Sequence, residues 1–421
     1  MKLTVWAVVV SGVVVSGVSG CEAPTAEELA TSNQALTVDT AAQQRGRARG
    51  RFLDLNGDGL ADLAVGAPGT NTTYIYYGNR GSAWRAPAAT LVGSLNDGSA
   101  VAAAGDVNAD GFGDLVVGSG NSTAVVYLGG RRGVSPTGTA LDNGGAIRFG
   151  ATVSAAGDLN GDGFGDVIIG TRYGSGIYLG GAAGIVTTPS QFISGPGSAG
   201  LTVLGGVDFN RDTHADVGVG SGNIGVNIFL GGAAGLPPAA SATFAGTGGA
   251  VPAGDINRDG YADLLVAAAG GRVDVYAGGP QGLGATPLVS LSGPGGSSVG
   301  DAIGFTMSSA GDINGDGYDD IVLGTGASDT AYLYLGRAGG PAPEPSVTLT
   351  GVAASGFGLA VAGVGDVNGD GYDDVVIGAP AGTGPGQAQL FLGGRRGLAT
   401  RPIATLTGPA SFGTAIARFS R

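Results

Sequence analysis

One nine-residue segment recurs seven times along the 421-residue chain, and it limits the possible folds more than any other feature. The copies share aspartate at positions 1, 5 and 9 and asparagine at position 3, as in DLNGDGFGD from Asp158. They begin at regular intervals, at Asp54, Asp106, Asp158, Asp208, Asp255, Asp312 and Asp366. Such a period indicates a repeat protein in which each copy marks one structural unit.

Each unit has the pattern of four short strands. The apolar run after the acidic segment, such as VIIG from Val167, is typical of a strand buried on both faces. A second strand (TAVVYLGG from Thr123) and a more polar third (SVTLTG from Ser346) follow, and a fourth (LAVAGVGD from Leu359) leads into the next acidic segment. Four strands in roughly 50 residues predict an all-β fold, a seven-bladed β-propeller. A parallel β-helix is the weaker alternative, because its coils are usually shorter and more regular.

The chain ends indicate how the ring closes. Phe-Gly precedes the acidic segment in later units, as at Phe149-Gly150 and Phe357-Gly358, whereas the first unit lacks it. The final segment, FGTAIARFSR from Phe412, has this pattern and stops where another acidic segment would begin. We therefore expect the C-terminal strand to complete the blade that starts near Phe52, which removes an exposed sheet edge.

The acidic segment has the composition of a calcium-binding loop. Calcium binds six to eight oxygen atoms, and alternate residues of a tight loop can converge on one point. Three carboxylates, an asparagine oxygen, the position-7 carbonyl and water would complete this shell, and glycine at position 6 permits the sharp turn. An EF-hand is excluded, because the closing acid comes at position 9 and no helical pattern flanks the loop.

The predicted calcium ligands occupy positions 1, 3, 5, 7 and 9 of each copy. They are Asp54, Asn56, Asp58, Leu60 and Asp62; Asp106, Asn108, Asp110, Phe112 and Asp114; Asp158, Asn160, Asp162, Phe164 and Asp166; Asp208, Asn210, Asp212, His214 and Asp216; Asp255, Asn257, Asp259, Tyr261 and Asp263; Asp312, Asn314, Asp316, Tyr318 and Asp320; and Asp366, Asn368, Asp370, Tyr372 and Asp374.

The charge balance favours a bound cation. These loops hold most of the 33 acidic residues, and crowded carboxylates repel one another unless a cation is present. Seven Ca²⁺ ions would change the formal net charge from −13 to about +1. Metal-free Asp/Asn turns are the alternative, and magnesium fits less well because it retains its waters. In the fourth copy Thr213 replaces the glycine and His214 occupies position 7, so we expect weak binding or vacancy there.

The remaining composition limits the chemistry. Lys2, His214 and Cys21 are the only lysine, histidine and cysteine. Catalysis by Ser-His-Asp, Cys-His or Schiff-base groups is therefore nearly excluded, and so is a Cys/His zinc site. The net charge of −13 also disfavours nucleic acid as a partner.

The first 51 residues have a different character. Residues 1–21 predict a secretory signal, because an apolar run too short and too interrupted for a confident transmembrane helix ends in Val18-Ser19-Gly20-Cys21. This ending resembles the bacterial lipobox, so Cys21 is the predicted lipidation site; a plain signal peptide with a coincidental cysteine is the alternative. Residues 22–51 predict a flexible tether and residues 52–421 the propeller. We expect a lipid-anchored protein at the outer membrane or cell surface.

The whole pattern resembles the FG-GAP repeats of the integrin α-chain propeller. The resemblance rests on the Phe-Gly pairs, on Gly66-Ala67-Pro68 and Gly378-Ala379-Pro380, and on the seven acidic loops, over about residues 52–421. It implies a seven-bladed propeller with calcium in the loop between the first two strands of a blade, held by positions 1, 3, 5, 7 and 9. This chain differs in having a loop in every unit, and we expect neither an inserted domain nor leg domains. Integrin-like adhesion therefore does not follow from the fold alone.

Three functions are compatible with these features. We favour a non-enzymatic surface module that presents one face to a protein or glycan partner. A lectin is less well supported, because Trp84 is the only tryptophan after the leader. A calcium-dependent polysaccharide lyase or hydrolase ranks last, because the spare aspartates recur at no fixed repeat position: Asp97, Asp142, Asp274, Asp301 and Asp329. The repeated strand tyrosines are expected to pack between blades: Tyr127, Tyr178, Tyr276 and Tyr334.

Overall fold

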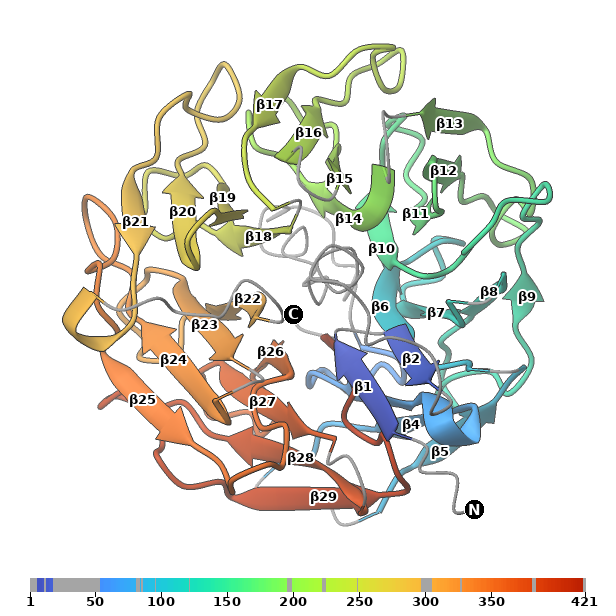
Figure 1. The fold of residues 1–421 in the computed structure, drawn as a ribbon. Helices are drawn as coiled ribbons and strands as arrows, with labels where there is room; N and C mark the ends of the chain where they lie inside the picture. The colour runs from blue at the N-terminus through green and yellow to red at the C-terminus, as the bar shows by residue number, and fades with distance from the viewer. Residues whose placement is uncertain are drawn as a thin grey trace.

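The computed structural model describes residues 54–418, except 81–83, 85, 95, 121, 195–198, 222–224, 248, 297–304, 326–327 and 381–383. It also gives two strands near the start of the chain, β1 (Trp6–Val10) and β2 (Val13–Gly17), which pair as an antiparallel hairpin. Within residues 54–418, seven four-stranded antiparallel sheets stand radially around a common axis (Figure 1). The predicted all-β, seven-bladed propeller is therefore confirmed.

Each blade runs outward from the axis in the strand order that the sequence suggests, apart from the first. The blades are, in order, β30 (Ala415–Arg418), β3 (Leu63–Ala67), β4 (Thr72–Tyr76) and β5 (Ala89–Val92); β6 (Ala100–Gly105), β7 (Asp114–Gly118), β8 (Ala124–Tyr127) and β9 (Thr139–Ala140); β10 (Val153–Gly157), β11 (Asp166–Gly170), β12 (Gly174–Tyr178) and β13 (Gln191–Ser194); β14 (Ala199–Val207), β15 (Asp216–Ser221), β16 (Gly225–Phe229) and β17 (Ala242–Phe244); β18 (Ala250–Gly254), β19 (Asp263–Ala268), β20 (Arg272–Tyr276) and β21 (Val289–Leu291); β22 (Phe305–Gly311), β23 (Asp320–Thr325), β24 (Thr330–Tyr334) and β25 (Val347–Thr350); and β26 (Ala360–Gly365), β27 (Asp374–Ala379), β28 (Gly386–Phe391) and β29 (Ala404–Gly408). Two short 3₁₀ turns, η2 (Pro68–Thr70) and η3 (Pro294–Gly296), lie outside the sheets.

The hydrophobic core is divided among the junctions between blades. Each of the seven buried clusters found in the described residues combines side chains of two neighbouring blades. The second strand of a blade, such as β11, is buried along its whole length because a blade covers each of its faces. The outermost strand, such as β13, alternates between exposed and buried residues, as the more polar sequence predicts. Burial therefore stabilises blade pairs rather than single blades.

An aromatic residue ends the third strand of every blade. The four tyrosines predicted to pack between blades are buried in these clusters, so that interpretation is confirmed. The set is completed by Tyr76, Phe229 and Phe391 in the other blades. The hydroxyl of Tyr178 donates a hydrogen bond to the carbonyl of Asp142, 2.7 Å away in the preceding blade connection. Tyr334 makes the equivalent bond to the Ser292 carbonyl at 2.7 Å, so these two tyrosines also hold a connection between blades.

The Phe-Gly pairs have a steric explanation. Phe149, Phe357 and Phe412 are buried, and the glycine that follows each one has a left-handed backbone. At Gly150 the φ angle is 78°, and a Cβ atom would lie 2.0 Å from the carbonyl oxygen of Thr123. A side chain cannot occupy that position, so the pair marks the corner that leads into the innermost strand.

The C-terminal strand closes the ring as the sequence predicted. β30 forms the innermost strand of the first blade and pairs antiparallel with β3, with Ile416 opposite Val65. Ile416 is fully buried between the last and first blades, in the cluster that contains Phe412 and Leu390. The first and last segments of the propeller therefore share one sheet, and the blade acquires the innermost strand that its own segment lacks.

Closure predicts a contrast between two isoleucines. Ile416→Ala should lower the free energy of unfolding by about 2–4 kcal/mol, because it leaves a cavity at the closing junction. Ile403→Ala is the matched control, since that side chain is 56% exposed and should change stability by less than about 0.5 kcal/mol. Urea unfolding followed by circular dichroism measures both. Equal losses of unfolding free energy in the two variants would show that the β30 side chain does not stabilise the closing junction.

Candidate metal centres

The seven acidic loops connect the first and second strands of each blade. In the third blade, for example, the loop joins β10 to β11, and Asp166 at position 9 is the first residue of β11. A break in the β10–β11 register between Ala155 and Gly157 turns the chain into the loop. The predicted ligands of each loop therefore lie at one end of a buried hairpin, where the sheet holds them in place.

Positions 1, 3 and 5 are organised by a network of side chain to backbone hydrogen bonds. In the third loop, one carboxylate oxygen of Asp158 accepts the amides of Gly161 and Asp162, at 2.6 and 3.0 Å. The amide oxygen of Asn160 accepts the Asp162 amide at 3.1 Å, and Asp162 accepts the Phe164 amide at 3.0 Å. The asparagine NH₂ group donates to Asp162 at 2.9 Å. These bonds aim several oxygen atoms into one tight loop.

The same bonds recur in the other copies. Position 5 donates its amide to the asparagine oxygen in every loop. Position 7 donates its amide to the position-5 carboxylate in every loop. The structure therefore brings together positions 1, 3 and 5 as the sequence predicted, and it adds a structural role that the sequence did not reveal.

Position 9 has a separate role in holding the blade together. One oxygen of Asp166 accepts the amide of Leu159 at position 2, and the other accepts the amide of Gly180 after β12, both at 2.9 Å. The equivalent pair of bonds is present at each of the other six copies. This aspartate therefore ties the loop to the far end of the third strand, besides serving as a candidate metal ligand.

Burial at position 9 makes an uncompensated negative charge costly. Burial, and to a smaller extent the other two aspartates of the loop, raises the pKa of this carboxyl from its usual 3.8. The pKa becomes about 8 in Asp62, Asp114, Asp216, Asp320 and Asp374, and about 7 in Asp166 and Asp263. Both oxygens accept amide hydrogens, an arrangement that suits the ionised form. A nearby cation would reconcile these two demands.

The first loop meets the distance requirement of a metal site most closely. One carboxylate oxygen each from Asp54, Asp58 and Asp62 lie within 4.8 Å of one another. Among the described residues this is the only group of three acidic, histidine or cysteine side chains that comes so close. The donor set consists entirely of the hard oxygen atoms that calcium prefers, so these residues fit that ion. In the other loops the hydrogen-bond network is the same, but the three carboxylates lie farther apart.

Two positions of each loop have a left-handed backbone. Position 6 has φ between 79° and 92°, and position 4 has φ between 56° and 76°. The glycine at position 6 is explained by the sequence, whereas the left-handed backbone at position 4 is not evident from it, because alanine or arginine occupies position 4 in three copies. Arg211 and Arg258, both at position 4, have φ of 58°, which is unusual for a residue with a side chain.

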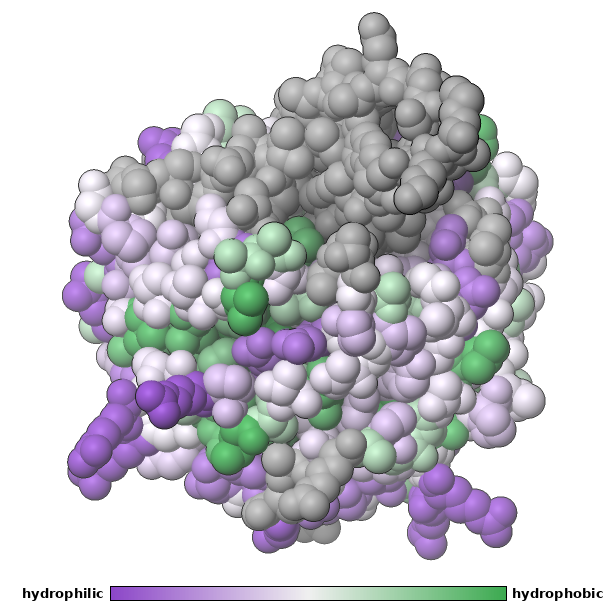
Figure 2. Space-filling model, turned by 60° about the horizontal axis from the view of Figure 1, so that its bottom comes forward, coloured by the Kyte–Doolittle hydropathy of each residue, from purple (hydrophilic) through white to green (hydrophobic). Residues whose placement is uncertain are grey.

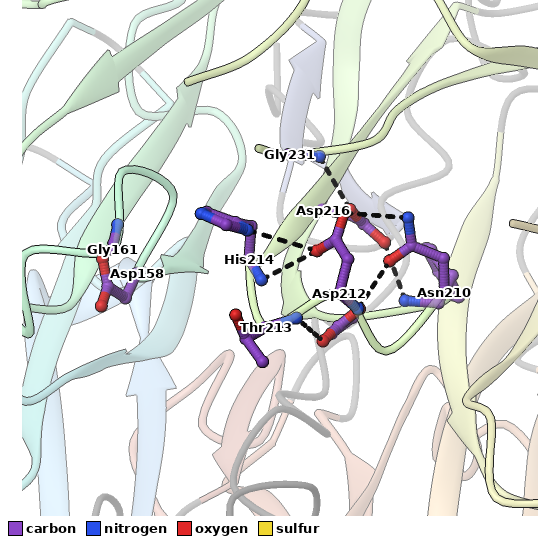
Figure 3. A network of polar contacts seen from close by, with 10 residues as sticks. Asp158, Gly161, Asn210, Asp212, Thr213, His214, Asp216 and Gly231 are labelled. Atoms are coloured by element: carbon purple, nitrogen blue, oxygen red, sulfur yellow. Dashed lines mark hydrogen bonds and ion pairs between the residues drawn. The ribbon is translucent and has the colours of Figure 1, made fainter. Parts of the chain in front are cut away.

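The fourth loop keeps the shared geometry despite its different sequence (Figure 3). Thr213 has φ of 79° and donates its amide to Asp208 at 2.9 Å, as the glycine does elsewhere. His214 Nδ1 lies 3.5 Å from a carboxylate oxygen of Asp212. The imidazole projects toward the third loop, since a Cβ at Gly161 would lie 3.6 Å from His214 Nε2. The substitution therefore strains this loop without abolishing its fold.

Neighbouring loops contact one another around the ring. The amide at position 8 donates to the position-1 carbonyl of the preceding loop, for example from Gly165 to Asp106 at 2.8 Å. Ala61 makes the same bond to Asp366 at 3.4 Å, which joins the first loop to the last. The side chain at position 7 lies over position 4 of the preceding loop; Tyr261, for example, faces the guanidinium of Arg211 with 5.8 Å to the ring centroid. Position 7 thus couples adjacent loops, which no single repeat reveals.

Residues considered for other functions have structural roles. Trp84 is buried against Tyr76 and donates a hydrogen bond to the Tyr77 carbonyl at 2.7 Å, so it offers no exposed sugar platform. The spare aspartates within the described residues accept hydrogen bonds from neighbouring groups. Asp142 accepts the Gly144 amide, Asp97 the Ser94 amide, Asp274 the Ser290 hydroxyl and Asp329 the Ala354 amide. Asp301, Cys21 and the predicted tether lie outside the described residues.

Comparison with known proteins agrees with this architecture. Residues 54–117 and 312–377 match a family model described as FG-GAP-like repeat, and residues 149–188 and 247–286 match FG-GAP repeat. Integrin alpha-6 of Gallus gallus is 37% identical over 118 residues, which cover 25% of this chain and 11% of that protein. Integrin alpha-IIb of Homo sapiens is 38% identical over 120 residues, or 25% of this chain and 12% of that protein. The match thus spans a small part of these relatives.

A crystal structure of BBS1N in complex with ARL6DN also resembles the chain, with a TM-score of 0.47 and 10% identity over 73% of this chain and 82% of that one. Fold, repeats and family models together define a seven-bladed β-propeller that contains FG-GAP and FG-GAP-like repeats. Its repeats are similar to those of integrin α chains. In the described part of the chain, no helix is long and apolar enough to cross a bilayer.

The strain at Thr213 predicts an unusual gain from glycine. Thr213→Gly should raise the free energy of unfolding by about 0.5–1 kcal/mol, because relief of the left-handed backbone exceeds the entropic cost of glycine. Thr187→Gly is the matched control, since Thr187 is exposed and its φ is not positive. That variant should lose about 0.5–1 kcal/mol. Urea unfolding at fixed calcium concentration measures both, and two losses would contradict the assignment of strain.

Proposed function

We propose that this protein is a calcium-binding, non-enzymatic recognition module held at the cell surface by a lipid on Cys21. The single observation that supports it best is the cluster of Asp54, Asp58 and Asp62, in which three carboxylate oxygens come within 4.8 Å of one another. A rigid propeller that repeats such a loop in every blade is a scaffold whose connections are free to bind a partner. The similarity to integrin α repeats favours the same class of role.

Calcium would be bound by the residues at positions 1, 3, 5, 7 and 9 of each loop. The ion would supply positive charge where buried and crowded carboxylates repel one another. The chain's own contribution is to hold the oxygens through amide hydrogen bonds and to fasten position 9 to the sheet. The fourth loop, with the strained Thr213, is the least favourable site.

The anchoring proposal depends on the leader. A single cysteine follows a short apolar segment and small residues, which is the order that bacterial lipidation requires. Diacyl or triacyl attachment would hold the protein stably at a membrane, since each buried CH₂ contributes about 0.8 kcal/mol. The proposed partner is a surface protein or glycan, and nucleic acid is disfavoured by the acidic charge.

Calcium dependence is tested with two aspartates of the third loop. For the native protein, calcium should raise the melting temperature. Each occupied site should add about 2.7 kcal/mol to the free energy of unfolding when free calcium is in hundredfold excess over the dissociation constant. Asp162→Asn, at the exposed position 5, should reduce the calcium stoichiometry by one and leave the calcium-free protein nearly as stable. Asp166→Asn should cost about 1–3 kcal/mol with and without calcium, because an NH₂ group replaces a buried acceptor.

Isothermal titration calorimetry and thermal melting with EDTA measure these effects. A melting temperature that EDTA leaves unchanged, together with no heat of calcium binding, would contradict the proposal.

Recognition is tested on the intact lipoprotein. Cross-linking at the surface of living cells, with and without chelator, should identify a partner captured only when calcium is present. Cys21→Ala should release the protein from the membrane fraction without changing the melting temperature of the propeller. A protein that stays in the membrane fraction after this substitution would show that Cys21 does not anchor it.

A further inference from the structure

The third blade departs from the repeat at the end opposite its acidic loop. The turn between β11 and β12 contains Arg172 and Tyr173. The corresponding turns of the other blades, residues 68–71, 119–123, 222–224, 269–271, 326–329 and 380–385, contain neither arginine nor an aromatic residue. Exposed Arg272 directly follows the fifth-blade turn, but only the third blade combines arginine with an aromatic residue in the turn itself. In a repeat protein, structure constrains all copies alike, so a combination confined to one copy points to a role beyond folding.

The fold brings three further residues to this turn. The Arg172 amide donates to the Ile147 carbonyl at 2.9 Å, which places Arg148 beside the turn. The Arg172 guanidinium lies over Tyr173, 5.4 Å from the ring centroid. Phe192 on the outer strand β13 leans over Gly174, where a Cβ atom would meet its ring at 2.7 Å. In Figure 1, β10 is the innermost strand of blade 3 and β13 lies at its outer edge. We call Ile147, Arg148, Arg172, Tyr173 and Phe192 the blade-3 patch.

The apolar members of the patch are unusually exposed. Ile147 and Tyr173 are each 54% exposed and Phe192 is 48% exposed, and these are among the few large hydrophobic residues that the described surface leaves open. On the face that Figure 2 draws, apolar residues lie in several areas separated by polar ones. Exposed aromatic and aliphatic side chains next to arginine have the composition of a protein-binding hot spot.

The two arginines have no negative partner among the residues that the structure describes. The only ion pair within this part of the chain joins His214 to Asp212, so no described carboxylate neutralises Arg148 or Arg172. Arg148 is half-buried and has a left-handed φ of 58°. Burial, followed by the nearby charge of Arg172, lowers the pKa of Arg148. Two adjacent positive charges that remain unpaired in a protein of net charge −13 would be stabilised by an anion from outside.

We propose that the blade-3 patch binds an acidic peptide segment of a partner protein. A carboxylate would accept paired hydrogen bonds from a guanidinium, and a neighbouring apolar side chain would pack against Phe192, Tyr173 and Ile147. A carbohydrate fits less well, because the aliphatic Ile147 adds surface for a protein side chain. The proposal rests on the proposed recognition function and identifies its face and the chemistry of its partner.

A random peptide library displayed on phage tests the proposal directly. Selection on the full-length, calcium-loaded protein should enrich aspartate or glutamate next to leucine, isoleucine or an aromatic residue. The selected peptide, labelled with fluorescein, should bind the double variant Arg148→Gln, Arg172→Gln at least tenfold more weakly by fluorescence polarisation. The matched control is Arg395→Gln, Arg396→Gln, two adjacent exposed arginines in the connection after β28, which should leave the affinity unchanged.

Melting temperatures confirm that the variants fold, and Arg172→Gln alone, in an exposed turn, should still weaken binding. Peptides without acidic enrichment, or peptides that bind both double variants equally well, would overturn the assignment of the patch while leaving recognition by another face intact. Retention on heparin or polygalacturonate through these arginines, with no binding of acidic peptides, would likewise overturn it. Absence of any peptide or cell-surface partner would remove the proposed function as well.

Discussion

A buried aspartate at the start of the second strand organises every blade. Its carboxylate accepts one amide from the acidic loop and one from the residue that follows the third strand, as Asp166 does for Leu159 and Gly180. These bonds favour the ionised carboxylate, whereas burial raises the pKa of the same group to about 7. The blade thus contains a conflict between hydrogen bonding and desolvation. A divalent cation held by the neighbouring loop oxygens would resolve it, and this would physically link metal binding to the fold.

The loops also join neighbouring blades through backbone hydrogen bonds. Amides at position 8 donate hydrogen bonds to carbonyls at position 1 of the preceding loop. The bond from Ala61 to Asp366 continues this series across the closing junction. On the axis side, β30 closes the same junction by pairing with β3. The ring is therefore closed twice, once by a strand and once by a loop. A cation at one loop would stabilise its own blade and, through these bonds, the next.

Much of this architecture followed from the sequence because it depends on features repeated within each unit. The period, the apolar runs and the terminal Phe412 segment were enough to predict seven blades, the buried second strands and the closing strand. The calcium ligand sets in all loops stay a prediction, although the first loop gathers its three carboxylates as expected. What the sequence did not reveal are contacts between units. The left-handed backbone of Arg211 is explained by the turn that its loop makes. The aromatic side chain of Tyr261 at position 7 is explained by its contact with Arg211 in the neighbouring loop.

Departures from the repeat therefore separate structural demands from functional ones. At Thr213 the backbone retains the angle that glycine adopts elsewhere, so the structure tolerates strain to preserve a loop shared by all blades. At Arg172 and Tyr173 no shared geometry demands those side chains, since the equivalent turns contain neither arginine nor an aromatic residue. The departure at Thr213 lowers stability and leaves the common loop intact. The departure at Arg172 and Tyr173 instead adds an exposed arginine and an exposed aromatic side chain to a single blade. Because a symmetric scaffold presents similar surfaces all round, specific recognition of one partner requires a local exception of the second kind.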